Sequence, residues 1–123
     1  MVAKSIVVIE FKFLKVFLYR DYVDMRKSMN GLSIIVEESL GRNPLDGSLY
    51  IFSNRSRKIL KMLYWDKTGY AIWHKRLEEA RYKWPRYGEQ SVSLSTEQLH
   101  FLLSGYDVWK MKPHKTLSYT ITT

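Results

Sequence analysis

Apolar residues along the chain are grouped in two ways, as β-branched and aromatic runs and as stripes with helical spacing. Residues 6–19 form the first run and are dominated by Val, Ile, Phe and Tyr. Residues 48–53 and 58–65 are two further runs, separated by the short polar loop 54–57. We therefore expect a strand in each run, the last two in antiparallel pairing.

Two stretches carry apolar residues at spacings of three and four, which place them on one face of a helix. The first predicts a helix over residues 25–40, with the carboxylate of Asp24 capping its first turn. The second predicts a helix over residues 96–104. Ser95 and Gln98 fit a capping box there, in which each residue bonds the backbone of the other.

Residues 70–84 fit two patterns. Alternation of inward and outward residues would make them strand, while Trp73 and Trp84 lie on a four-residue stripe that would make them helix. Gly69 ends a loop of hairpin length before the stretch, and Pro85 ends either version. The pattern alone leaves both alternatives open.

Positive charge is concentrated in one window. Residues 55–86 hold ten basic and three acidic residues, a net charge of +7 out of +8 for the whole chain, together with three of the four tryptophans. Basic residues interleaved with aromatic ones fit a surface that binds a polyanion. The same mixture is typical of the solvated face of a sheet. With a pI near 9.7, nucleic acid is the expected partner.

The candidate nucleic-acid contacts are the basic side chains of this window. They are Arg55, Arg57, Lys58, Lys61, Lys75, Arg76, Arg81 and Lys83. Candidate additional contacts are Arg26, Lys27, Trp73 and Trp84. For the two basic residues the alternative is an internal ion pair, and for the two tryptophans it is packing in the core.

Catalytic chemistry is not expected from these residues. The aspartates Asp21, Asp24, Asp46 and Asp66 occupy turn or cap positions, and the three histidines lack the spacing of a zinc site. Neither a nucleophile elbow nor a phosphate-binding loop motif occurs. Without cysteine, disulfides and thiolate metal sites are excluded. We therefore predict a protein that is not an enzyme and needs no metal or cofactor.

A chain of 123 residues has the size of one domain. We expect a single domain over residues 1–123, with a loosely ordered tail from about residue 112. The apolar start of the chain is interrupted by Glu10, Lys12 and Lys15, so neither a membrane helix nor a signal peptide is expected. The expected location is the cytoplasm, with no membrane partner.

Several short motifs occur in a recognisable order. They are Asp24-Met25-Arg26-Lys27-Ser28 with Gly31-Leu32, Trp65-Asp66 with Gly69, Trp73 with Lys75-Arg76-Leu77-Glu78, Arg81-Tyr82 with Trp84-Pro85, and Leu102-Leu103 with Gly105 and Asp107. In this order the series resembles the TnpB-type accessory protein of the insertion sequence sixty-six family of bacterial transposable elements. The resemblance runs from about residue 16 to 115.

The resemblance implies a role in transposition beside a separate, larger transposase that holds the catalytic carboxylates. Members usually carry glycine where this chain has Ala80, and glycine there suits a hairpin turn. We therefore expect strands at 70–77 and 80–84. The expected fold is α+β, an antiparallel meander of four or five strands with helices at about 25–40 and 96–104.

Two functions follow as expectations. The first is a non-catalytic accessory protein that contacts DNA through the basic region 55–86. The second is a protein-interaction module that binds the transposase or another element-encoded subunit without touching DNA, because exposed aromatic residues often anchor interfaces. The sequence indicates neither the DNA sequence preference nor the oligomeric state.

Overall fold

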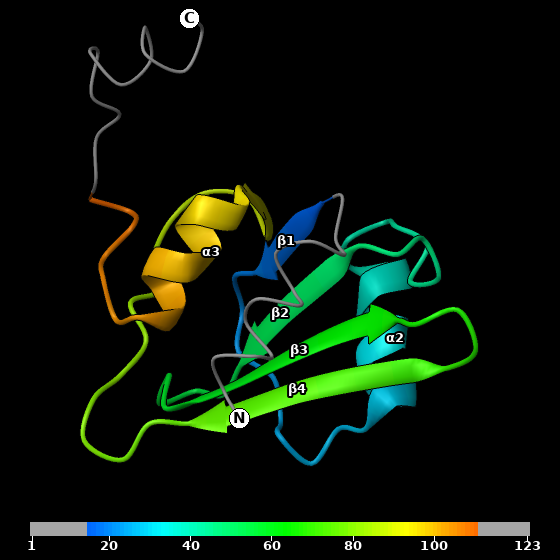
Figure 1. The fold of residues 1–123 in the computed structure, drawn as a ribbon, viewed down its shortest axis with the longest axis horizontal. Helices are drawn as coiled ribbons and strands as arrows, with labels where there is room; N and C mark the ends of the chain where they lie inside the picture. The colour runs from blue at the N-terminus through cyan, green and yellow to red at the C-terminus, as the bar shows by residue number, and fades with distance from the viewer. Residues whose placement is uncertain (1–14, 111–123) are drawn as a thin grey trace, which may run out of the picture.

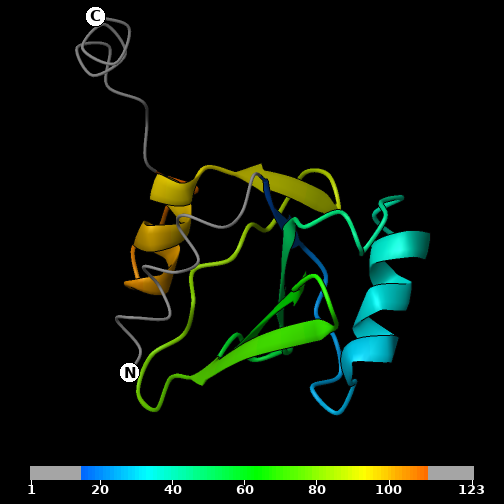
Figure 2. The same cartoon turned by 45° about the vertical axis from the view of Figure 1, so that its right-hand side comes forward.

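A five-stranded sheet lies at the centre of residues 15–110, the part of the chain that the computed structural model describes (Figure 1). In the order β4-β3-β2-β1-β5, its strands are β1 (Val16–Tyr19), β2 (Leu49–Ser53), β3 (Ile59–Trp65), β4 (Tyr70–Arg76) and β5 (Ser91–Leu94). The helices are α2 (Met29–Glu38) and α3 (Thr96–Leu103). They lie on opposite sides of the sheet (Figure 2). The predicted α+β class, with four or five strands and two helices, is confirmed.

The pairing of the strands is mixed. β2, β3 and β4 form the expected antiparallel meander. β1 runs parallel to β2, with Val16 opposite Leu49, because α2 carries the chain from one end of the sheet back to the other. β5, which was not predicted, pairs antiparallel with β1 and forms the second edge.

Each face of the sheet is covered by its own apolar cluster. On the α3 side, Leu18, Ile51 and Met62 are fully buried beneath α3. On the α2 side, Tyr50 and Phe52 pack against the buried face of α2. All five residues of β2 are buried, as expected of a central strand covered on both faces.

The first helix is shorter than predicted. It begins at Met29 and not at residue 25, and its N-cap is Ser28, which makes no side-chain capping bond. Asp24 is not a helix cap, because its carboxylate accepts bonds from the amide and guanidinium of Arg26 instead. Met29 is 41% exposed, so the apolar stripe begins effectively at Leu32.

The predicted strand at 80–84 is wrong. Residues 77–90 contain no helix or strand, and they cross the α3 side of the sheet as an extended segment (Figure 2). Tyr82 and Trp84 point into the α3-side cluster, which explains the alternating pattern. The Tyr82 amide, however, donates to the carbonyl of Arg57 and not to β4.

The remaining local predictions agree with the structure within about one residue at each boundary. β2, β3 and β4 lie where they were expected, and α3 begins with the predicted capping box of Ser95 and Gln98. Residues 6–14 of the first predicted strand and the tail from 112 lie outside the described residues. Within residues 15–110 no helix has the length and apolar character needed to cross a membrane.

Candidate nucleic-acid interface

The segment 77–90 forms one wall of the candidate site. Its course begins at the turn between β2 and β3, where the Leu77 amide donates to the Lys58 carbonyl and the Tyr82 amide to the Arg57 carbonyl, both at 2.8 Å. Tyr82 and Trp84 are 2% and 9% exposed. Burial of alternate side chains therefore leaves the residues between and beside them, Arg81 and Lys83, exposed to solvent.

Arg57 joins this segment to the end of β1. The residue has a positive φ of 62° in the turn between β2 and β3. Its guanidinium donates to Ser53 Oγ at 2.7 Å and to the Arg20 carbonyl at 3.1 Å. The indole Nε1 of Trp84 donates to the same carbonyl at 2.9 Å. The turn, the segment and the end of β1 thus meet at the Arg20 carbonyl.

Further bonds fix the rest of the segment. The Arg20 guanidinium donates to the Arg86 carbonyl at 3.2 Å, and the Arg20 amide donates to the Gln90 carbonyl at 2.8 Å. After α3, the indole Nε1 of Trp109 donates to the Lys83 carbonyl at 2.7 Å. These bonds use backbone carbonyls of the segment, so its basic side chains are not needed to hold it.

A groove opens between these parts of the chain. Its volume is about 640 Å³, and it is bordered by the end of β1, the turn before β3, the segment 77–90 and the residues after α3. Six of its lining residues are basic: Arg20, Arg57, Arg81, Lys83, Arg86 and Lys110. Two are acidic, Asp21 and Asp107. We call these lining residues the basic groove.

None of the six cations forms an ion pair within residues 15–110. The three ion pairs there lie elsewhere and join Arg26 to Asp24, Arg42 to Asp46 and Arg76 to Glu78. Asp21 accepts a bond from Gln90 at 2.6 Å, and Asp107 accepts one from the Trp109 amide. Burial lowers the pKa of Arg57, the charge of Asp21 offsets part of this shift, and the neighbouring Arg20 adds to it. Such a groove fits an anionic ligand.

The predicted contacts are only partly brought together. Arg57, Arg81 and Lys83 line the basic groove, and Arg55 and Lys58 lie in the adjoining turn. Lys61 does not line the groove. Its ammonium donates to the backbone carbonyls of Met25 and Lys27, on the α2 side of the sheet. The side-chain charge of Lys27 takes no part in these bonds.

The two predicted contacts on β4, Lys75 and Arg76, do not share a face of the sheet. Lys75 stands opposite Leu60 and Arg76 opposite Ile59, so the two side chains point to opposite faces of the sheet. Arg26, a candidate additional contact, pairs with Asp24 at 2.6 Å, which was the alternative considered for it. Arg20, Arg86 and Lys110 line the groove but were not predicted as contacts.

The two tryptophans named as candidate contacts are largely engaged within the protein. Trp84 is buried, and the Arg57 guanidinium lies 5.1 Å from its ring centroid. Trp73 packs against the α3-side cluster. Trp84 therefore offers no open stacking surface, and Trp73 is half-buried.

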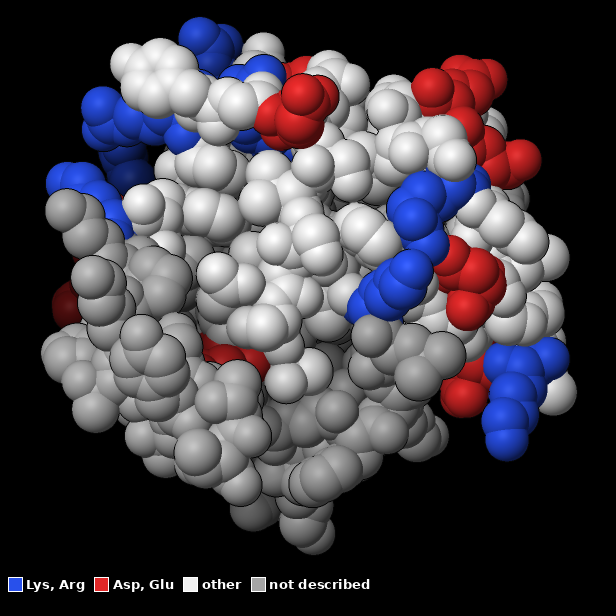
Figure 3. All heavy atoms as spheres, turned by 90° about the horizontal axis from the view of Figure 1, so that it is seen from above, with Lys and Arg blue, Asp and Glu red and all other residues white. Residues whose placement is uncertain are grey.

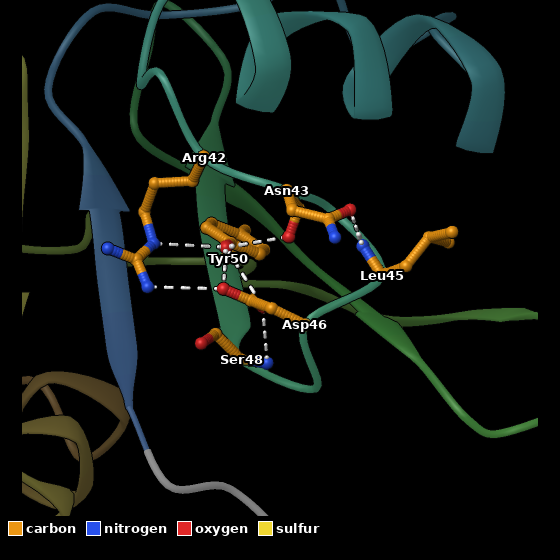
Figure 4. A network of polar contacts seen from close by, with 6 residues as sticks. All are labelled: Arg42, Asn43, Leu45, Asp46, Ser48 and Tyr50. Carbon is orange, nitrogen blue, oxygen red and sulfur yellow. Dashed lines mark hydrogen bonds and ion pairs between the residues drawn. The ribbon is translucent and has the colours of Figure 1, made fainter.

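The surface charge is uneven. Seen from above, basic side chains gather at the edge on the side of α3, while acidic and basic side chains alternate on the side of α2 (Figure 3). On the α2 side, Arg42 bonds Asp46 and the hydroxyl of Tyr50 (Figure 4). The guanidinium of Arg42 also lies 4.0 Å from the ring centroid of Phe17.

This second polar cluster fixes the loop between α2 and β2. The Tyr50 hydroxyl donates to the Asp46 carboxylate, which also accepts from the Ser48 amide at 2.8 Å. Burial alone would raise the pKa of Asp46, but the bonds from Ser48, Tyr50 and Arg42 lower it overall. Residues 15–110 contain no cluster of three or more histidines or carboxylates placed to hold a metal ion.

Comparison with known proteins places this fold in a family. The chain matches the IS66 Orf2-like family over residues 14–113. It is similar to the uncharacterised protein y4hO of Sinorhizobium fredii, with 38% identity over 78% of this chain and 83% of the relative. A second uncharacterised protein of that organism, y4jC, is 28% identical over 80% of this chain and 85% of its own length.

No solved structure matches the chain significantly. The family match covers the sheet, both helices and every residue of the basic groove. The chain therefore belongs to the IS66 Orf2-like family, a family of accessory proteins in the transposition of insertion sequences.

Proposed function

We propose that this accessory protein contacts DNA through the basic groove and does not itself catalyse strand transfer. The observation that carries the proposal is the convergence of six cations on one groove without an ion pair among residues 15–110. Four of them, Arg81, Lys83, Arg86 and Lys110, are exposed. Exposed cations at the rim of a groove neutralise phosphates and release the counterions that DNA holds.

The shape of the groove supports this assignment. Arg20 and Arg57 lie at its inner side and are held by backbone carbonyls, so they contribute a fixed positive potential. The exposed cations lie on two separate parts of the chain, the segment 77–90 and the turn after α3. A nucleic-acid backbone passing between these parts could contact both.

Fluorescence anisotropy with a labelled duplex at increasing salt tests the proposal. With about four phosphates neutralised, the logarithm of the association constant should fall against the logarithm of salt concentration with a slope of about −4. A competition with poly-L-glutamate at equal concentration of anionic groups should leave most of the duplex bound. No binding of DNA at about 100 mM salt would contradict the proposal.

An alternative is binding to the transposase or another element-encoded subunit without DNA contact. A second, smaller groove of about 470 Å³ favours it, because Leu45, Tyr64 and Trp65 line it beside Asp46 and Asp66. Leu45 is 48% exposed and would offer an apolar contact to a protein partner. Co-purification with the transposase from nuclease-treated extract, lost on Leu45→Asp, is the expected result of this alternative.

A further inference from the structure

Two of the most exposed aromatic residues flank the basic groove. Tyr22 lines it and is 54% exposed, and Tyr87 directly follows the lining residue Arg86 and is 87% exposed. The guanidinium of Arg55 lies 5.7 Å from the centroid of the Tyr22 ring. Exposed aromatic side chains beside a row of cations are typical of sites that stack on bases.

The structure holds the two tyrosines on neighbouring segments. Arg20, two residues before Tyr22, bonds the Arg86 carbonyl, one residue before Tyr87. The Arg20 amide bonds the Gln90 carbonyl, and Asp21 accepts a bond from the Gln90 side chain. Three bonds therefore fix the backbone that carries Tyr22 against the backbone that carries Tyr87.

The two tryptophans predicted as contacts are not placed to stack on bases at the groove. Trp84 is 9% exposed and is covered by Arg57, and Trp73 packs against the α3-side cluster. Trp109 is half-buried and its indole donates to the Lys83 carbonyl, so the exposed rings beside the groove are those of Tyr22 and Tyr87. In an intact duplex the base faces are already stacked on one another, so exposed rings at a groove fit bases that are unpaired.

We propose that the basic groove binds an unpaired stretch of DNA, with Tyr22 and Tyr87 stacking on its bases while the groove cations contact its phosphates. This inference rests on the proposed function and names the form of DNA. Cations alone would accept any phosphate backbone, whereas the tyrosines require bases whose faces are accessible. Single-stranded RNA offers the same two groups, so the test distinguishes the two strands.

The test compares labelled strands of equal length that differ in their bases. One strand is oligo(dT), the second carries the same phosphates on abasic sugar spacers, and the third is oligo(U). The proteins are the wild type, the double variant Tyr22→Ala/Tyr87→Ala and a matched control, Tyr106→Ala. Tyr106 is 57% exposed, lies outside the groove lining and packs edge-on to Phe101.

We expect the wild type to bind oligo(dT) at least about fivefold more tightly than the abasic strand for each stacked base. The double variant should bind both strands with the affinity that the wild type has for the abasic strand. Tyr106→Ala should behave as the wild type does. Both changed tyrosines are exposed, so circular dichroism should show an unaltered fold.

Equal binding of oligo(dT) and the abasic strand by the wild type would overturn the stacking proposal and leave phosphate binding by the groove in place. Tighter binding of oligo(U) than of oligo(dT) would overturn the assignment to DNA. Failure to bind any strand or duplex would contradict the proposed function itself.

Discussion

The guanidinium of Arg57 lies over the ring of Trp84, 5.1 Å from its centroid, and both side chains donate to the carbonyl of Arg20. The Arg57 guanidinium therefore joins the walls of the groove through bonds within the protein. Changing it would disturb the turn before β3 as well as remove a charge. Variants that test DNA contact are better made at the exposed cations of the groove.

Trp84→Phe tests this junction. The change keeps an aromatic ring but removes the indole donor to the Arg20 carbonyl and some of the buried volume, so we expect a loss of about 2 kcal/mol in the free energy of unfolding. Urea denaturation followed by circular dichroism measures it. Trp65→Phe, at the half-buried end of β3 beside Tyr70, is the control and should cost less than about 1 kcal/mol. Equal losses in the two variants would contradict the account.

Tyr82 makes stability depend on alkaline pH. Burial raises the pKa of its hydroxyl to about 12, and the oxygen has no hydrogen-bond partner within the described residues. Unfolding returns the group to its ordinary pKa near 10, so between about pH 10 and 12 only the native state keeps the proton. Stability should fall as the pH rises through this range, by up to about 1.4 kcal/mol per pH unit.

Tyr82→Phe should reduce this alkaline loss and leave stability at pH 7 unchanged or slightly higher, because it removes a buried hydroxyl without a partner. Urea midpoints measured from pH 8 upwards compare the two proteins. Parallel curves for wild type and variant would show that another group causes the loss.

Asp46 makes stability depend on acid pH. Burial opposes its ionisation, but the bonds from Ser48, Tyr50 and Arg42 lower its pKa below the ordinary value of 3.8. The stabilisation is therefore complete above that value and is lost as the pH falls through the lower native pKa. Asp46→Asn should flatten the acid limb of the urea midpoint against pH. The exposed Asp66→Asn is the control, and an equal effect there would count against the network.

The capping box of α3 should stabilise the folded protein, because it fixes the helix that covers the α3-side cluster. Ser95 Oγ accepts from the Gln98 amide at 3.0 Å, and Gln98 Oε1 accepts from the Ser95 amide at 2.8 Å. Ser95→Ala should lower the free energy of unfolding by about 1 kcal/mol. Ser93→Ala, exposed on the neighbouring strand β5, should be nearly neutral. The prediction fails if the two changes have the same effect in urea.

Elements with local signals were predictable from the sequence. The capping box fixes where α3 begins, and aromatic and β-branched runs locate β2 and β3. The pattern of β4 also fitted a helix, and the family resemblance decided for a strand there. The parallel pairing of β1 with β2 was not predictable, because it depends on how α2 returns across the sheet. The strand expected at 80–84 failed because alternation reveals which residues are buried, whereas the partner of the Tyr82 amide is set by tertiary structure.

The candidate site was predictable only where its residues fall in the local charge window. Arg57, Arg81, Lys83 and Arg86 lie within the charge window 55–86 and line the groove. Arg20 and Lys110 lie far outside the window and join the groove only because β1 ends and α3 ends beside the segment 77–90. Composition over a window cannot reveal such a contribution.

The most direct test of the groove compares two triple variants that each remove three positive charges from residues 55–86. Arg81→Gln/Lys83→Gln/Arg86→Gln changes the groove, and Lys67→Gln/Lys75→Gln/Arg76→Gln changes the same number of cations outside it. The measurement is the salt dependence of DNA binding by anisotropy. For the groove variant, the slope of the logarithm of the association constant against the logarithm of salt concentration should be smaller in magnitude by about 2 to 3. The slope of the control variant should stay close to that of the wild type. Equal changes in both variants, or a larger change in the control, would contradict binding through the groove.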